Sequence, residues 1–203
     1  MAKRNAGGDV ASQIATLEPL LADREKTLGA EHPNTLLTRN NLANAYRDAG
    51  RTQDAIGILE SLLSDLERVF GGEHPNTLLT RGNLAGAYEA SGRSQDAIEI
   101  LESLVADRER LLGTSHPETL ANRGNLANAY QAAGRTQDAI AILEPLRADL
   151  EPRLGAEHPN TLSTRGNLAN AYQAAGRTQE AIEIYESLLA DLERILGAEH
   201  PNT

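Results

Sequence analysis

The chain has 203 residues, a formal net charge of −10 at pH 7 and no cysteine. The missing thiol excludes disulfides and zinc–thiolate sites and fits a reducing compartment, so we expect a cytoplasmic protein. The acidic balance argues against nucleic acid as a partner, and the lack of any stretch of roughly 18 apolar residues argues against a membrane.

The first segment in chain order is a short tail followed by a single helix. Residues 1–8 carry two basic residues and no apolar run, which predicts a disordered tail rather than a secretory signal. Residues 9–31 are predicted to hold one helix, over about residues 9–28, that has no partner helix before it.

Beyond this helix the chain repeats itself. The stretch "LGAEHPNTLLTR" begins at Leu28, and close copies follow four more times, so that successive histidines, such as His32 and His74, lie 42 residues apart. A period of this size indicates a stacked array of supersecondary units rather than one globular core. The predicted units are residues 32–73, 74–115, 116–157 and 158–199, and residues 200–203 start a truncated further unit.

Each repeat is predicted to be a pair of helices. In the first repeat Pro33 suits the first position of a helix, which makes His32 its N-cap. The following apolar residues recur with helical spacing, and Gly50 ends this helix. Thr52 is predicted to cap the second helix, whose apolar face runs on to Phe70.

A histidine beside a glutamate in most copies raises the question of a metal or catalytic site. Equivalent residues of neighbouring repeats should lie roughly 16–20 Å apart, because each interhelical contact spans about 8–10 Å. Metal ligands must instead converge on one ion, with imidazole nitrogens about 2.0–2.1 Å from it. We therefore interpret the histidines as helix caps and predict no metal site, no cofactor and no catalytic residue.

The segment "NLANAYRDAGRTQDAIGIL", from Asn41 to Leu59, resembles the tetratricopeptide repeat, with signature positions at Leu42, Ala43, Tyr46, Gly50 and Ala55. The 42-residue period and the linking "LG.EHP.TL" are similar to the variant found in kinesin light chains and many bacterial proteins. The resemblance implies an all-α fold, an alpha-alpha superhelix of antiparallel helix pairs (a right-handed TPR-like solenoid), with about nine helices here. It also implies that residues 9–31 hold the second, B-type helix of a partial repeat. The first helices of the repeats are expected to line a concave groove.

The first helices carry asparagines on one face, which the resemblance places in the groove. Asparagine offers a donor and an acceptor, so it can pair with the backbone of an extended peptide of any sequence. Neighbouring positions vary between repeats and are candidates for specificity. The predicted partner-binding residues are Asn41, Asn44, Asn83, Asn125, Asn128, Asn167 and Asn170, with Arg47, Glu89, Gln131 and Gln173 at the variable positions.

Two sets of polar residues leave a structural alternative open. Asn41 and its counterparts at 83, 125 and 167 could instead bond the neighbouring helix, because buried amides need partners. A row of arginines on the first helices could grip the carboxylates of a peptide, or could meet aspartates on the adjoining second helix. The pairs would be Arg39–Asp65, Arg81–Asp107, Arg123–Asp149 and Arg165–Asp191.

The sequence thus predicts a non-enzymatic scaffold that binds a peptide or partner protein in the groove. The alternative is a self-associating structural array, a homo-oligomer joined end to end or by exchange of terminal helices, because uncapped repeat stacks expose apolar faces. An enzyme is not expected, since the chain shows no Gly-rich phosphate loop and no Ser–His–acid arrangement.

Overall fold

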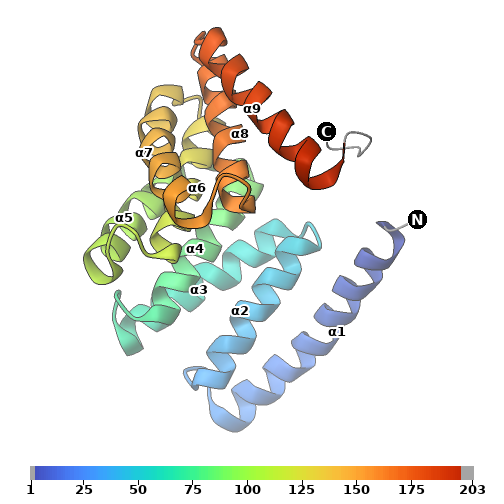
Figure 1. Ribbon diagram of the computed structural model, residues 1–203. Helices are drawn as coiled ribbons and strands as arrows, with labels where there is room; N and C mark the ends of the chain where they lie inside the picture. Colours follow the sequence, from blue (N-terminus) through green and yellow to red (C-terminus); the bar gives the residue numbers. More distant parts are fainter. Residues whose placement is uncertain (1–2, 198–203) are drawn as a thin grey trace. The chain divides into compact units, whose positions relative to one another are not determined.

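The computed structural model describes residues 3–197, and this part of the chain holds nine α-helices and no strand (Figure 1). The long first helix is α1, Lys3–Leu28. The first helices of the repeats are α2 (Pro33–Asp48), α4 (Pro75–Ala90), α6 (Pro117–Ala132) and α8 (Pro159–Ala174). The second helices are α3 (Thr52–Phe70), α5 (Ser94–Leu112), α7 (Thr136–Leu154) and α9 (Thr178–Leu196). The predicted all-α fold of helix pairs is confirmed, and none of these helices combines the length and the apolarity needed to cross a bilayer.

The start of α1 differs from the sequence prediction. The helix begins at Lys3, so residues 3–8, predicted to be a disordered tail, continue it. Extending a helix that is already nucleated adds one hydrogen bond for each residue fixed. A polar segment can therefore become helical when it directly precedes an amphipathic helix.

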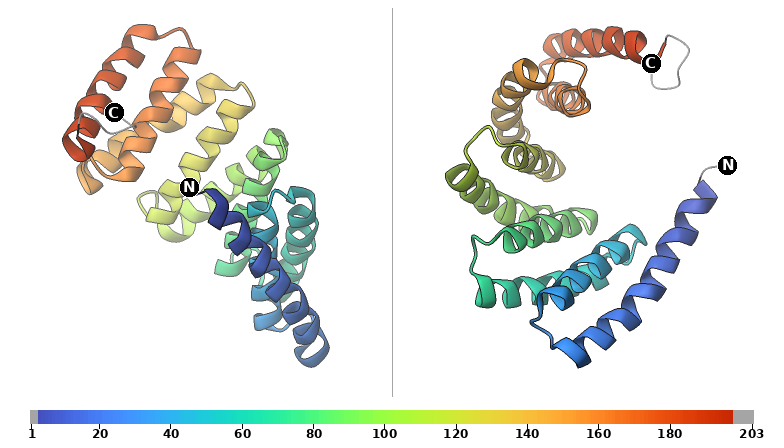
Figure 2. Two further views of the ribbon diagram at one scale, coloured as in Figure 1. Left: turned by 90° about the vertical axis from the view of Figure 1, so that its right-hand side faces the viewer. Right: turned by 60° about the horizontal axis from the view of Figure 1, so that its bottom comes forward.

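The chain forms two compact units, and the boundary between them lies within α5. Unit 1, Met1–Ile100, holds α1–α4 and the start of α5, and unit 2, Leu101–Thr203, holds the rest of α5 and α6–α9. In unit 1, α2 packs between α1 and α3, and α4 packs on α3; in unit 2, α7 packs between α6 and α8, and α9 packs on α8 (Figure 2). The first helices also touch one another within each unit, α2 with α4 and α6 with α8.

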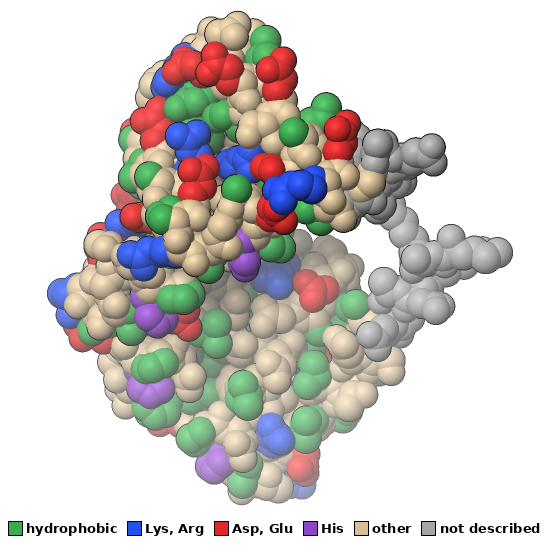
Figure 3. Space-filling view, viewed as in Figure 1, with side chains coloured by type: hydrophobic (Ala, Val, Ile, Leu, Met, Phe, Trp, Pro, Cys, Tyr) green, Lys and Arg blue, Asp and Glu red, His purple; other side chains and the backbone are tan. Residues whose placement is uncertain are grey.

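A histidine closes the turn before each first helix, as predicted. His32 has an extended backbone (φ −64°, ψ 137°), and its Nδ1 accepts a hydrogen bond from the amide of Asn34 at 3.2 Å. His74, His116 and His158 make the same bond at 3.2–3.3 Å, whereas His200 lies outside the described residues. Figure 3 shows histidine side chains in purple on the surface of the face that it draws. Among the side chains that the structure describes, no three of His, Cys, Asp or Glu gather as a metal site would require.

Removing one of these caps should have a small, measurable effect. We expect His158→Ala to lower the free energy of unfolding by about 1 kcal/mol, because the amide of Asn160 loses its acceptor. His158→Asn keeps a capping oxygen and should stay within about 0.5 kcal/mol of the unsubstituted chain. Urea unfolding followed by circular dichroism measures both variants. An equal loss in the two would mean that the ring acts through packing and not through the cap.

The second helices begin differently from the prediction. Helix α3 starts at Thr52, and its N-cap is Arg51, whose side chain makes no capping hydrogen bond. The predicted Thr52 cap is wrong, because Thr52 already has helical geometry and a capping residue must lie outside the helix. The turn is made by Gly50 in the left-handed region (φ +77°). Arg51 Nε donates instead to Asp54 in the first turn, at 2.7 Å.

The core of each unit lies between successive helices. One stripe of α3 is almost fully buried, formed by Ala55, Ile56, Leu59, Leu62 and Leu66. In unit 2 the same stripe of α7 is buried, formed by Ala139, Ile140, Leu143, Leu146 and Leu150. These two stripes are buried because α3 packs between α2 and α4, and α7 packs between α6 and α8.

Candidate functional site

In unit 1, asparagines of the predicted groove line a cleft between α1 and α2. This α1–α2 cleft is open to solvent, with a volume of about 480 Å³. It is lined by Ser12, Gln13, Thr16 and Leu17 of α1 and by Asn41, Asn44, Ala45 and Asp48 of α2. Its lining is mostly polar and uncharged, with one carboxylate at Asp48. The side-chain oxygen Oδ1 of Asn44 is buried and accepts no hydrogen bond.

Unit 2 has a second cleft, between α6 and α8. This α6–α8 cleft encloses about 200 Å³. Asn125, Asn128 and Asn167 line it together with the small residues Ala121, Gly124 and Ser163. Leu120, Leu146 and Leu150, which form one apolar cluster, also line the cleft. Amides above an apolar base with small neighbours leave room for the backbone of a ligand to approach closely.

Three of the predicted asparagines link first helices to each other. Asn83 Nδ2 of α4 donates to Asn40 Oδ1 of α2 at 2.8 Å, and Asn167 Nδ2 of α8 donates to Asn128 Oδ1 of α6 at 2.8 Å. Sequence reasoning missed Asn40, which stands where the other repeats have glycine. At positions 83 and 167 the asparagine therefore makes the inter-helix bond of the structural alternative, whereas Asn41 and Asn125 are exposed.

The variable positions have different surroundings in each repeat. Gln131 Nε2 donates to the backbone oxygen of Asn167 at 2.8 Å, and Arg47 pairs with the adjacent Asp48 at 3.4 Å. Glu89 is half-buried, and this burial raises the pKa of its carboxyl group. Gln173 is exposed, and Asn170 accepts a hydrogen bond from the Tyr185 hydroxyl of α9.

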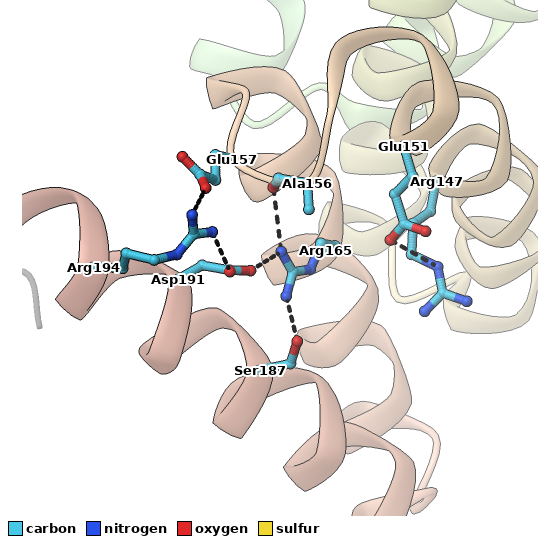
Figure 4. A network of polar contacts seen from close by, with 8 residues as sticks. All are labelled: Arg147, Glu151, Ala156, Glu157, Arg165, Ser187, Asp191 and Arg194. Atoms are coloured by element: carbon cyan, nitrogen blue, oxygen red, sulfur yellow. Dashed lines mark hydrogen bonds and ion pairs between the residues drawn. The ribbon is translucent and has the colours of Figure 1, made fainter.

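The arginine row faces the second helices. Arg39 pairs with Asp65 at 2.6 Å, Arg123 with Asp149 at 3.3 Å and Arg165 with Asp191 at 2.6 Å. Figure 4 shows the last of these, where the Arg165 guanidinium also reaches the Ala156 carbonyl and the Ser187 hydroxyl. These contacts confirm the structural alternative for these three arginines, because each guanidinium pairs with the aspartate of the adjoining second helix.

A cluster that the sequence reasoning did not find ties adjacent repeats together. The hydroxyl of Tyr46 in α2 donates to Glu18 of α1 at 2.6 Å, and the Arg51 guanidinium stacks 4.0 Å from the centre of the Tyr46 ring. The same three residue types meet around Tyr88, Tyr130 and Tyr172. The signal was present in the sequence, since the glutamate and the arginine recur with the period of the repeat.

The electrostatics of this Tyr–Glu–Arg cluster fit a structural role. Burial, followed by the hydrogen bond to Glu102, raises the pKa of Tyr130 to about 12. The pKa of Tyr46 is raised as well, mainly by the hydrogen bond to Glu18 and next by burial. Both hydroxyls therefore stay protonated and remain donors across the neutral pH range.

Comparisons with known proteins decide the family. Two sequence models described as the tetratricopeptide repeat match the chain, one over residues 35–76 and 161–202 and the other over residues 92–145. A solved structure of kinesin-light-chain-like repeats from Podosopora anserina is 38% identical, has a TM-score of 0.85 and covers 95% of this chain and 92% of that one. This chain belongs to the tetratricopeptide repeat family. Its members generally act as scaffolds for protein–protein interaction and typically are not enzymes.

More distant tetratricopeptide-like structures share the fold alone. BtubC (BKLC) from P. vanneervenii is 18% identical, with a TM-score of 0.73 over 100% of this chain and 95% of that one. A Rap protein complexed with Competence and Sporulation Factor is 14% identical, with a TM-score of 0.66 over 91% of this chain and 50% of that one. A search of curated proteins finds no match to the sequence.

Proposed function

We propose that this chain is a non-enzymatic scaffold that binds an extended segment of a peptide or partner protein along the asparagine-bearing face of its first helices. The observation that carries the proposal is the α1–α2 cleft, where side-chain amides and hydroxyls line an open volume of about 480 Å³. The α6–α8 cleft has similar chemistry on a smaller scale, with four asparagines and three leucines in its lining. A cytoplasmic location fits the lack of cysteine.

The chemistry of the α1–α2 cleft suits a peptide backbone. The Oδ1 atom of Asn44 is a buried acceptor without a donor, a situation that costs roughly 1–3 kcal/mol. A rotation of the Asn44 side chain that brings Oδ1 into the cleft would let it accept from a peptide N–H, and Asn41 would supply both a donor and an acceptor beside it. Asp48 and the net charge of −10 favour a neutral or basic segment over an acidic one.

A peptide selection tests this proposal. Peptides chosen from a random display library on the unsubstituted chain should bind the Asn41→Ala/Asn44→Ala variant about tenfold more weakly or worse, because two amide contacts are lost. The matched control is Asn34→Ala, an exposed asparagine on α2 that does not line the cleft, and it should change the affinity less than about twofold. Fluorescence anisotropy gives the affinities. Equal binding by all three proteins, or no selected peptide at all, would contradict the proposal.

Self-association is a second candidate function, and a different observation favours it. Helix α9 exposes Ile182, Tyr185 and Leu189, at 37–42% of their accessible surface. Contiguous apolar side chains on one helix face are typical of a surface that is covered by a partner.

A further inference from the structure

The exposed face of α9 occupies positions that are buried in the earlier second helices. Ile182 is 42% exposed, whereas its counterpart in α3, Ile56, is 3% exposed. Tyr185 is 37% exposed, whereas Leu59 at the same repeat position is 1% exposed. In α3 and α7 the first helix of the following repeat, α4 or α8, covers these positions, and among the described residues no helix follows α9. This face therefore has the shape and composition to receive a first helix.

Helix α1 carries apolar residues at the same repeat positions, and a first helix, α2, packs on them. Ile14, Leu17 and Leu21 of α1 pack against Leu42 and Tyr46 of α2. Four repeats later in the sequence, the corresponding residues of α9 are Ile182, Tyr185 and Leu189. The two helices thus carry matching apolar faces, although only that of α1 is covered.

A polar contact matches as well. Glu18 of α1 accepts the hydroxyl of Tyr46, and the counterpart of Glu18 in α9 is Glu186. Among the described residues, Glu186 is the one member of this glutamate series to which no tyrosine donates. Placed on α2 instead of α1, α9 would bring Glu186 to Tyr46 in the position of Glu18 and rebuild the Tyr–Glu–Arg cluster with Arg51.

We propose that the exposed face of α9 docks on α2 of a second copy of this chain, in the place that α1 occupies here. The inference rests on the self-association candidate and names its surface. The contact joins α9 of one copy to α2 of the next, two different surfaces, so it is heterologous and can extend into chains of copies. The occupant is a second copy because α2 already receives a helix with this pattern of side chains.

The packing of α1 makes its replacement feasible. Within unit 1, α1 packs on α2 alone, whereas each of α2 and α3 packs between two helices. Arg24 of α1 bonds Thr38 at 2.6 Å, and its counterpart in α9 is Leu192. A leucine fits this position, since Leu66 of α3 holds it and is 2% exposed. Helix α9 can therefore match the contacts that α1 makes, with more apolar surface.

Light scattering over a dilution series tests the proposal with three variants of the full chain. Tyr185→Asp puts a charge into the docked face and should raise the dissociation constant of self-association about tenfold or more. Leu17→Asp weakens the competing helix α1 and should lower that constant, again about tenfold. The control is Ile195→Asp on α9, because its counterparts in packed repeats, Val69 and Leu111, are also exposed, at 38% and 40%. It should leave the constant unchanged.

The first two variants are expected to change the dissociation constant in opposite directions, which non-specific hydrophobic association would not do. Circular dichroism confirms that each variant keeps its helix content. A monomeric mass for the unsubstituted chain at every concentration would overturn both the self-association candidate and the docking surface. Self-association that survives Tyr185→Asp, or that Leu17→Asp fails to strengthen, would overturn the docking of α9 on α2 and leave the self-association candidate standing.

Discussion

Leu59→Ala should lower the free energy of unfolding by roughly 2–5 kcal/mol, because it removes a fully buried side chain and leaves a cavity that neighbouring helices fill only in part. Leu59 lies on α3 and is 1% exposed, covered by helices on two sides. The loss is a large fraction of the stability of a chain of this size. Urea unfolding at a concentration where the chain is monomeric measures it.

The matched control for Leu59 is the same repeat position in α9. Tyr185→Ala should cost only about 1 kcal/mol, because its side chain is 37% exposed and little is lost from the core. The repeat position is thus constant while the burial differs. If the two variants lost equal stability in the monomer, the α9 face would be covered within the chain itself, and the docking surface proposed above would be wrong.

Arg165→Met should have the second large effect, a loss of roughly 2–3 kcal/mol. The Arg165 side chain is 6% exposed and gives hydrogen bonds to Asp191, Ser187 and the Ala156 carbonyl, as Figure 4 shows. Methionine keeps the apolar stem but removes all these donors. The control is Arg194→Met, which also pairs with Asp191 but is 62% exposed, and it should stay within about 0.5 kcal/mol.

The effect of Arg165 should also depend on pH. Its hydrogen bond holds the pKa of Asp191 below the ordinary value of 3.8, and the contact with Arg194 adds to this. A lowered folded-state pKa contributes stability above the unfolded-state pKa, and the contribution is lost as pH falls through the folded-state pKa. The difference between the unsubstituted chain and Arg165→Met should therefore be constant from neutral pH to about pH 5 and narrow below pH 3.8. A difference that persists undiminished at pH 2 would show that Arg165 acts through its stem.

Features with local causes were predictable from the sequence. His32 and Pro33 together predict a capped helix, because the ring accepts from an amide only two residues away. The pairing of Arg39 with Asp65 could be anticipated as one alternative, because the two helices of a repeat are adjacent. The Thr52 cap failed for an equally local reason: the turn at Gly50 sets Thr52 inside the helix and leaves Arg51 outside it.

Features that depend on a neighbouring repeat were harder to predict. Asn83 has the sequence context of a groove residue, yet its amide bonds Asn40 of the preceding first helix. Asn41 stands at the same repeat position and is exposed. The sequence could not distinguish these two fates, because the partner depends on which side chain faces the asparagine from another repeat. The bond between Tyr46 and Glu18 was missed for the same reason, since the two residues lie in different repeats.

The sequence by itself determined the period, the helix pairs, the histidine caps and the family, because each follows from residues a few positions apart or from recurrence at a fixed interval along the chain. Only the tertiary structure decided which asparagines line a cleft and which join helices, and which apolar stripe stays uncovered. The physical reason is that repeats with nearly the same sequence differ in what packs against them. Leu59 and Tyr185 hold one repeat position, and only the helix that follows Leu59 makes that position part of the core.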